Sequence, residues 1–240
     1  MNIGKVRDLF AAALEGEQFV TDKSGVKTIE IIGSSFIVDQ NTIFGEPNDD
    51  YIRRELEWYD SQSLNVNDFP GGAPTIWKQV ADPEGFINSN YGFLLFSNEN
   101  GNQYKNVLEE LSRNPLSRRA VAVYTRPSIW TDYNKNGMSD YICTNAVQYV
   151  IRDGTLDAVV QMRSGDSVYG FKNDRAWAQH VLDKLAKDLN VPAGYITWQV
   201  GSLHVYERHF YLVDHYNKTG EHKISKKKYA DLYPESIWIN

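Results

Sequence analysis

The sequence predicts an α+β fold in one large domain. Helical and strand-like segments are interspersed irregularly, a short hairpin turn joins two of the strand-like segments, and no repeat or linker divides the chain. Local hairpins favour a largely antiparallel or mixed sheet with flanking helices over a strict alternation of strands and helices. With 240 residues, 42% of them hydrophobic, the chain can bury one full core. We therefore expect a single domain over residues 1–240.

The individual elements follow from the spacing of apolar residues. Helices are predicted where apolar residues recur at three and four: Val6–Leu14, Asp50–Tyr59, Gln103–Leu111 and Arg175–Leu189. Strands are predicted where β-branched and aromatic residues gather: Thr28–Ile32, Ala120–Tyr124, Ala146–Ile151, Leu156–Met162 and Ile196–Val205. Asp153-Gly154 predicts a two-residue hairpin turn. The turn-rich stretches Pro70–Pro74 and Asp132–Gly137 are expected to be surface loops.

Charge and composition limit the class of protein. A net charge of −6 argues against nonspecific binding to DNA but leaves room for a local cationic pocket that holds one phosphate. No apolar run approaches the roughly 20 residues of a membrane span, and the N-terminal residues lack the apolar core of a signal peptide. A single cysteine fits a reducing compartment. We expect a cytoplasmic protein that binds neither membrane nor DNA, and nothing in the sequence indicates a metal.

Cys143 is the one cysteine, and polar motifs follow it in the chain. It precedes Arg163-Ser164-Gly165-Asp166 and, further on, Asp174. A single cysteine is most often a small buried hydrophobe or an incidental thiol. A catalytic cysteine acts as its thiolate, which nearby arginines stabilise while they bind an anionic substrate. The arginines of this chain therefore make a nucleophilic thiol the hypothesis of interest.

The motifs of the chain occur in a recognisable order. They are Asp22–Gly25, Glu55–Trp58, Ile76-Trp77, Asn114–Arg119, Cys143, Gln148, Arg163–Asp166 and Gly201–Tyr206. In order and spacing they resemble the thymidylate synthase family over nearly the whole chain. Further runs resemble the T-even phage branch that hydroxymethylates deoxycytidylate: Tyr124–Ser128, Asp132–Lys135, Gly137–Asp140 and Tyr211–His215. The resemblance implies a homodimer with shared active sites, deoxycytidylate (dCMP) as substrate and 5,10-methylenetetrahydrofolate as co-substrate.

The same resemblance gives catalytic roles to two residues. Cys143 is expected to add as thiolate to carbon-6 of the pyrimidine, which turns carbon-5 into a nucleophile for the one-carbon unit. Glu55 is expected to organise water and move protons. The alternative for Glu55 is an exposed helix charge paired with Arg54 or Lys78. Glu57, two residues further, lies on another helix face and is left out of the site.

Binding roles are also implied residue by residue. The 5′-phosphate is assigned to Arg163 and Ser164, to Lys23 as a weaker point-charge contact, and to Arg118 and Arg119 from the other subunit. The alternative for the adjacent arginines is a solvated edge charge. His204 and Tyr206, which share one strand face, match the pair that binds the deoxyribose 3′-hydroxyl, and Trp77 and Asp166 match folate contacts. Without the resemblance, the first pair would be ordinary strand residues and Trp77 a core residue.

Asp174 stands where thymidylate synthases carry an asparagine that faces the pyrimidine edge. An amide offers a donor and an acceptor together, which suits uracil, whereas a carboxylate accepts, which suits the 4-amino group of cytosine. Asp174 is therefore expected to select dCMP, and we hypothesise that it shares a proton with nitrogen-3 of the ring. The alternative is an N-cap of the helix predicted from Arg175.

Departures from the family pattern leave two alternatives open. Thr144 and Ser202 replace a histidine and an aspartate, Tyr91–Phe96 lacks a Gln-Trp-Arg motif, and the tail Pro234–Asn240 differs. These changes put methyl transfer in doubt. A thymidylate synthase or another pyrimidine-nucleotide methylase stays one alternative, and a noncatalytic nucleotide-binding homologue with a structural Cys143 is the other. The resemblance also implies a phage origin and leaves open an association with other nucleotide-synthesis enzymes.

Overall fold

The chain folds into two compact units built from interleaved segments. The computed structural model describes residues 1–239, so Asn240, the last residue of the predicted domain and tail, lies outside the described residues. Unit 1 comprises Met1–Pro47, Arg163–Ala176 and the chain from Thr197, and unit 2 comprises Asn48–Met162 and Trp177–Ile196. Neither unit is one continuous stretch of sequence, so the chain passes back and forth between the two units. The single catalytic domain stays a prediction.

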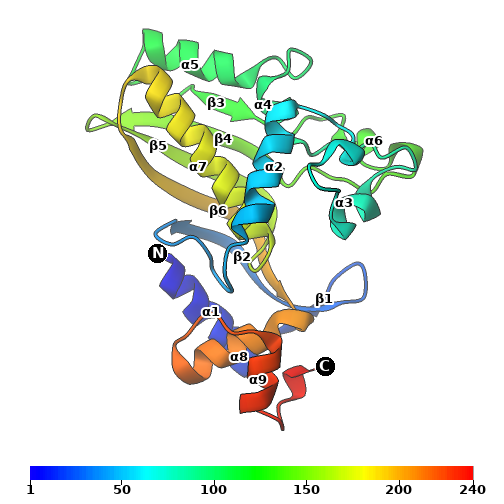
Figure 1. Cartoon of the computed structure of the whole chain (residues 1–240). Helices are drawn as coiled ribbons and strands as arrows, with labels where there is room; N and C mark the ends of the chain where they lie inside the picture. The colour runs from blue at the N-terminus through cyan, green and yellow to red at the C-terminus, as the bar shows by residue number, and fades with distance from the viewer. Residues whose placement is uncertain (240) are drawn as a thin grey trace. The chain divides into compact units, whose positions relative to one another are not determined.

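A six-stranded sheet forms the β part of the fold (Figure 1). Its order is β1-β2-β6-β5-β4-β3, with β1 Phe19–Thr21, β2 Lys27–Ile37, β3 Val121–Val123, β4 Thr144–Arg152, β5 Thr155–Asp166 and β6 Ala193–Tyr206. The pairs β1–β2, β2–β6, β3–β4 and β4–β5 are all antiparallel. The α+β class with a largely antiparallel sheet is thereby confirmed.

The predicted hairpin turn joins β4 and β5. Asp153 and Gly154 have φ angles of 49° and 81°, the left-handed values that a two-residue type I′ turn requires at both central positions. The turn sets the register, which pairs Arg152 with Thr155 and Val150 with Asp157. Cys143 thus precedes β4 at the end of the hairpin opposite the turn.

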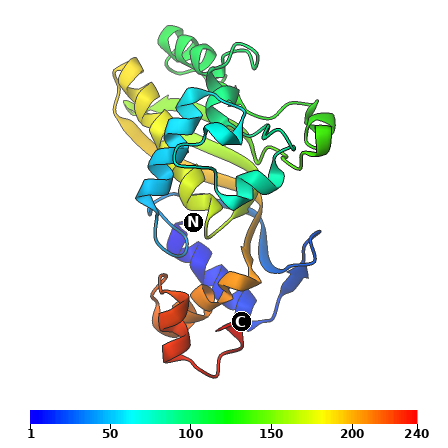
Figure 2. The same cartoon turned by 45° about the vertical axis from the view of Figure 1, so that its right-hand side comes forward.

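Helices in unit 1 pack on the sheet and on each other. Helix α1, Ile3–Glu15, contacts β2 and α8, Phe210–Thr219, and Figures 1 and 2 show α1 and α8 side by side in both views. The apolar side of α1 is buried through Ile3, Val6 and Phe10. The remaining helical elements of the unit are η3 Glu207–His209, α9 Lys226–Leu232 and η4 Ile237–Ile239.

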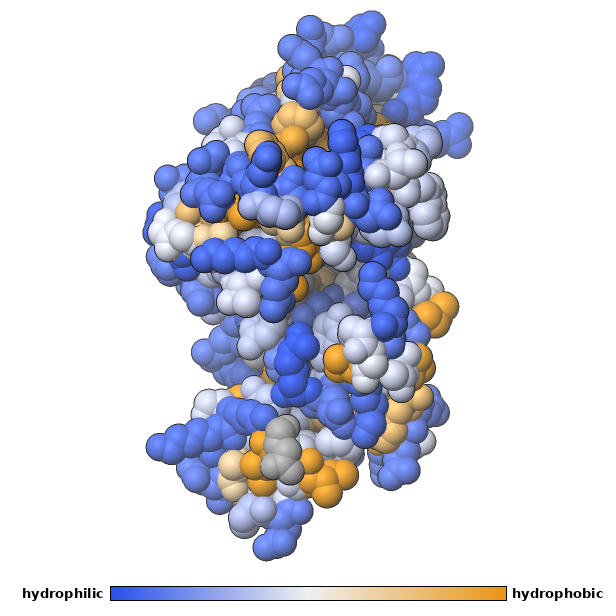
Figure 3. All heavy atoms as spheres, turned by 90° about the vertical axis from the view of Figure 1, so that its right-hand side faces the viewer, coloured by the Kyte–Doolittle hydropathy of each residue, from blue (hydrophilic) through white to orange (hydrophobic). Residues whose placement is uncertain are grey.

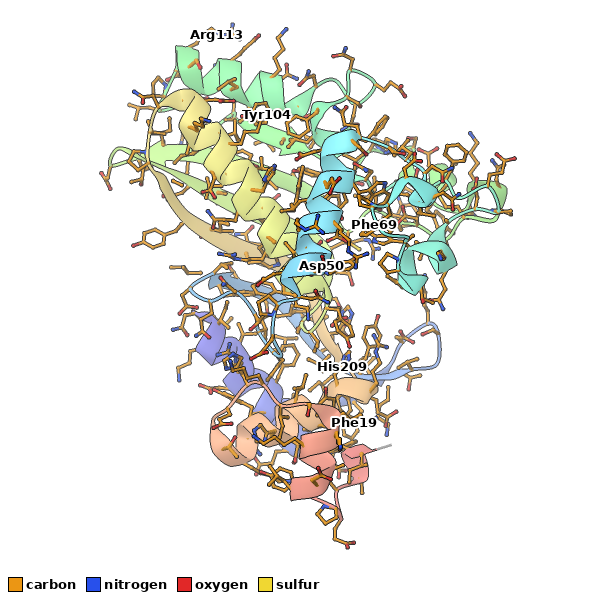
Figure 4. The ribbon with its side chains drawn as sticks, in the orientation of Figure 1. Phe19, Asp50, Phe69, Tyr104, Arg113 and His209 are labelled. Atoms are coloured by element: carbon orange, nitrogen blue, oxygen red, sulfur yellow. The ribbon has the colours of Figure 1, made fainter. Side chains whose placement is uncertain are left out.

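Unit 2 contains the other helices. They are α2 Asp49–Ser61, η1 Val66–Asp68, α3 Thr75–Val80, α4 Tyr91–Phe96, α5 Gln103–Arg113, α6 Ile129–Asp132, η2 Lys135–Gly137 and the larger part of α7, Gly170–Leu189. Asn48 caps α2 by accepting a hydrogen bond from the Tyr51 amide at 3.0 Å. In Figure 4, Asp50 marks the first turn of this helix and Phe69 lies beside it. Aromatic rings fill the core around α2, where Tyr59 contacts both Tyr91 and Trp177.

The structure confirms the predicted helices and strands and corrects one boundary. Each predicted segment lies within or overlaps an observed element of the same type. Short elements, such as β1, α3 and α4, were not predicted because they are too short to show a periodic pattern. Helix α7 begins at Gly170, five residues before the predicted start, so Asp174 lies inside it. The N-cap alternative for Asp174 is therefore wrong.

One face of the molecule is mainly polar. On the face in Figure 3, hydrophilic side chains predominate and hydrophobic ones gather in small groups between them, in keeping with a mean hydropathy of −0.49. None of the helices between residues 1 and 239 is long and apolar enough to cross a membrane.

Gly92 in α4 provides a test of the packing in unit 2. A Cβ atom at this position would lie 1.7 Å from the Tyr59 carbonyl oxygen, so the helices α2 and α4 could not keep their spacing. We predict that Gly92→Ala lowers the free energy of unfolding by about 3 kcal/mol. Gly4→Ala is the control, because the nearest atom to its new Cβ is 3.5 Å away and a helical alanine is favoured over glycine. Equal urea midpoints for the two variants would contradict the prediction.

Candidate active site

Cys143 lies at the entrance to β4 in unit 2. The residues on either side of it, Ile142 and Thr144, are buried, whereas Cys143 itself is partly exposed. Its Sγ lies 3.7 Å from the Tyr141 carbonyl oxygen. The register of β4 against β5 shifts between Thr144 and Ala146, and such irregularities re-aim side chains next to functional sites. The thiol is therefore held between two anchored neighbours and remains accessible.

Glu55 is a buried carboxylate on α2. Its side chain accepts a hydrogen bond from the Tyr51 hydroxyl at 2.6 Å and from the Trp77 indole at 3.3 Å. Burial raises the pKa of Glu55 from 4.5 to about 7, and these two hydrogen bonds offset only part of that effect. With only 5% of the residue exposed, the alternative of an exposed helix charge is wrong. A carboxyl group with this pKa can accept and release a proton near neutral pH.

Near Glu55, the Glu57 side chain is exposed whereas Trp77 is half-buried. The Glu57 side chain is 61% exposed and pairs with Arg53, which supports leaving it out of the site. Trp77 on α3 is half-buried, stands 5.2 Å from the Trp58 ring and also lies within hydrogen-bond distance of the Tyr51 hydroxyl. Sequence reasoning missed Tyr51. Its position one helical turn before Glu55 was the available signal.

The arginine pair expected to act across subunits lies between α5 and β3. Both side chains are exposed. Arg119 forms an ion pair with Glu110 at 3.0 Å, whereas the Arg118 guanidinium has no protein partner within residues 1–239. The Arg118 carbonyl accepts a hydrogen bond from Gln148 at 2.8 Å, which ties this segment to β4. The exposure fits either a solvated edge or a phosphate contact.

Unit 1 carries the other predicted residues, beginning with the end of β5. Arg163 is exposed there, Ser164 is half-buried and Gly165 is buried. A Cβ at Gly201 on β6 would lie 2.8 Å from the Arg163 carbonyl oxygen. The close approach therefore requires glycine, and it fixes the backbone from which the Arg163 side chain projects.

Asp166 and Asp174 lie close to the same glycine. A Cβ at Gly170 would stand 3.3 Å from the Asp166 Cβ and 3.7 Å from the Asp174 Oδ2. Asp166 accepts a hydrogen bond from the Val168 amide at 2.8 Å. Burial lowers the pKa of the neighbouring Lys172, and the Asp166 charge works in the opposite direction. The structure thus brings the predicted base-selecting carboxylate and the predicted folate contact to one end of α7.

His204 and Tyr206 share one face of β6. Their rings are 4.9 Å apart at 80°, as expected for residues two apart on a strand. The Ser167 amide donates to the His204 carbonyl at 2.9 Å, which joins the segment after Asp166 to this strand. Lys23 is exposed in the turn between β1 and β2, where Asp22 accepts from the Ser24 amide at 2.8 Å.

Comparison with known proteins decides the family. A family profile described as thymidylate synthase matches residues 7–229.

The chain belongs to the thymidylate synthase family.

Similar members carry two different names. The chain is 58% identical to the deoxycytidylate 5-hydroxymethyltransferase of Enterobacteria phage T4, over 97% of this chain and 98% of that protein. It is also 58% identical to the enzyme of the same name from Enterobacteria phage T6, over 95% and 96%. Identity to the thymidylate synthase of Bacillus subtilis subsp. natto is 28%, over 78% of this chain and 64% of that protein. The predicted family membership is confirmed.

Within this thymidylate synthase-family chain, each unit carries a distinct set of candidate residues. Unit 2 holds the thiol, the buried carboxylate, Trp77 and the exposed arginine pair, and unit 1 holds the remaining residues predicted to contact phosphate, sugar, base and folate. No cluster of three or more potential metal ligands occurs among residues 1–239. The residue roles stay predictions.

The pKa of Glu55 predicts a pH dependence of stability. The folded-state pKa of about 7 lies above the ordinary 4.5, so this group's contribution is full below pH 4.5 and is lost as the pH rises through 7. At about 1.4 kcal/mol per pKa unit, the loss is about 3 kcal/mol. Glu55→Gln should remove this pH-dependent loss in urea unfolding, and Glu57→Gln, on the exposed side of α2, should keep it. Parallel curves for Glu55→Gln and the unchanged protein would count against a raised pKa.

Proposed function

We propose that this chain converts dCMP, 5,10-methylenetetrahydrofolate and water to 5-hydroxymethyl-dCMP and tetrahydrofolate. The observation that carries the proposal is the 58% identity, over nearly both full lengths, to the T4 deoxycytidylate 5-hydroxymethyltransferase. The thymidylate synthase alternative rests on 28% identity over 78% of the chain. The enzyme is therefore a one-carbon transferase of the thymidylate synthase family.

Cys143 begins the reaction as a thiolate. Its addition to carbon-6 places electron density on carbon-5, which attacks the methylene carbon of the folate. Carbon-5 gives its proton to a water molecule as the carbon–nitrogen bond to the folate breaks, and an exocyclic methylene group results. Water adds its oxygen to this carbon, the electron pair returns to the ring, and the thiolate leaves carbon-6. The accessible but anchored thiol before β4 supports this role.

Glu55 handles the protons of this sequence. A carboxyl group with a pKa of about 7 is present in both protonation states at neutral pH. It can therefore give a proton to the departing folate amine and then, as the carboxylate, accept one from the attacking water. The Tyr51 hydroxyl at 2.6 Å fixes the orientation of the carboxylate. A positioned general base of this kind contributes roughly 10²–10⁴-fold to the rate.

Base selection belongs to Asp174. Its carboxylate accepts a hydrogen bond from the cytosine 4-amino group, and a proton shared with nitrogen-3 makes carbon-6 more electrophilic. Uracil presents oxygen-4 to the same carboxylate, and two acceptors facing each other leave both unsatisfied. Asp174 lies on the rigid frame of α7, which supports a fixed orientation toward one base.

The other binding roles complete the proposal. Arg163, Ser164 and Lys23 bind the 5′-phosphate, together with Arg118 and Arg119 from the second subunit of a homodimer. The exposed guanidinium of Arg118, which has no protein partner within residues 1–239, supports a role toward another molecule. His204 and Tyr206 bind the 3′-hydroxyl.

The folate contacts fit the chemistry of that co-substrate. Trp77 presents a half-buried aromatic ring, which suits the flat conjugated parts of the folate. Asp166 presents carboxylate oxygens that accept hydrogen bonds from pterin N–H groups. When bound, 5,10-methylenetetrahydrofolate supplies the carbon that is transferred.

Replacement of Asp174 tests base selection and reaction type together. The unchanged enzyme should add CH₂O to dCMP and form no dihydrofolate, as measured by mass spectrometry and folate absorbance. Asp174→Asn should lower kcat/KM for dCMP by about 10- to 100-fold, because each unsatisfied buried group costs about 1–3 kcal/mol, and it should raise turnover of dUMP. Asp183→Asn is the matched control, because Asp183 is an exposed carboxylate on the same helix. Addition of CH₂ to dUMP with dihydrofolate formation by the unchanged enzyme would make it a thymidylate synthase.

A further inference from the structure

A buried aspartate fastens the segment that leads to the thiol. Asp140 lies three residues before Cys143 and is 6% exposed. Its Oδ2 accepts hydrogen bonds from the amides of Asn88 and Ser89, both at 2.7 Å. Its Oδ1 accepts one from the Ser89 hydroxyl, also at 2.7 Å. Three short bonds therefore hold one carboxylate against a segment about 50 residues earlier in the chain.

The side chain of Asn88 also bonds to the segment that precedes Cys143. Its Nδ2 donates to the carbonyl oxygens of Asp140 at 3.0 Å and Asp132 at 3.2 Å. Its Oδ1 accepts from Arg126 at 3.0 Å, and Arg126 also pairs with the Asp132 carboxylate at 3.0 Å. One asparagine therefore holds three points of the stretch from Arg126 to Asp140 together.

The opposite side of this network reaches the helix of Glu55. Asn90 is fully buried, and its Nδ2 donates to the carbonyls of Trp58 at 3.1 Å and Ser63 at 2.8 Å. Trp58 lies on α2, three residues after Glu55. A continuous path of backbone and hydrogen bonds therefore runs from α2 through residues 88–90 to Asp140 and on to Cys143. Every member of the path belongs to unit 2.

We propose that Asp140 is a positioning residue that fixes the Cys143 thiol relative to the Glu55 carboxylate. The proposal rests on the proposed function, because it assigns those two groups to one reaction. In this role Asp140 acts through the segment that carries the thiol. Loss of its three bonds lets this segment move, and a displacement of about 1 Å costs about 100-fold in rate where two groups must meet a substrate.

Replacement of Asp140 should affect the chemical step more than substrate binding. Asp140→Ala is expected to lower kcat about 100-fold. It should change KM for dCMP by less than about threefold, because the residues proposed to bind the substrate are unchanged. Asp140→Asn should restore most of kcat. Its amide oxygen can accept from both backbone amides, and its NH₂ group can donate to the Ser89 hydroxyl. Asp157→Ala is the matched control, because Asp157 also accepts a backbone hydrogen bond, from Tyr195 at 2.7 Å, but lies at the turn end of the hairpin.

A second readout separates this proposal from the proposed function. Dehalogenation of 5-bromo-dCMP in the presence of an added thiol requires addition of Cys143 to carbon-6 but no folate. The Cys143→Ser variant gives the background rate of this assay. Asp140→Ala should slow this reaction as well. If the unchanged enzyme dehalogenates but forms no hydroxymethyl product, the proposed function fails while the effect of Asp140 can still be measured.

Two results would overturn the positioning role. One is an unchanged kcat for Asp140→Ala, measured well below its melting temperature. The other is an equal fall in kcat for Asp157→Ala. If Asp140→Ala does not fold, Ser89→Ala, which removes one of the three bonds, decides instead: a reduced kcat at constant KM supports the proposal, and an unchanged kcat contradicts it.

Discussion

The burial of one carboxylate governs the chemistry available to unit 2. Glu55 on α2 is buried, and a charge in such surroundings must be hydrogen-bonded or neutralised. Tyr51 and Trp77 supply the hydrogen bonds, yet burial still raises the pKa to about 7. The same environment that costs stability at high pH thus produces a group able to exchange protons at neutral pH. The position of Trp77, and with it α3, is tied to this carboxylate.

The thiol depends on a separate set of constraints. Cys143 stands before β4, at the end of the hairpin opposite Asp153-Gly154, and its leading segment is fastened through Asp140. Pairing of β4 with β5 fixes the chain after Cys143, and the buried hydrogen-bond network fixes the chain before it. Because that network continues through Asn90 to α2, the proposed nucleophile Cys143 and the proposed proton carrier Glu55 share one framework. The proposed substrate contacts of unit 1 lie near Gly170 and Gly201, and at Gly201 the close approach of the Arg163 carbonyl oxygen leaves no room for a Cβ.

Residue patterns predicted the elements that have a clear local cause. Asp153-Gly154 specified a turn, and the periodicity of Asp50–Tyr59 specified a helix. The resemblance of motifs identified the family, which the profile match over residues 7–229 confirms. The burial of Glu55 could not be predicted from its own helix, since Trp77 comes from another element. The proposed role of Asp140 could not be predicted from the sequence either, because its partners lie about 50 residues away and meet it only in the fold.

Turnover in water carrying a heavy oxygen isotope tests the central claim most directly. Purified enzyme would be given dCMP and 5,10-methylenetetrahydrofolate in the labelled water, and the nucleotide product and folate would be analysed together. If water completes the reaction, the new hydroxyl group contains the heavy isotope, and tetrahydrofolate is formed without dihydrofolate. A methyl product without the label, accompanied by dihydrofolate, would show that hydride completes the reaction and would contradict the account.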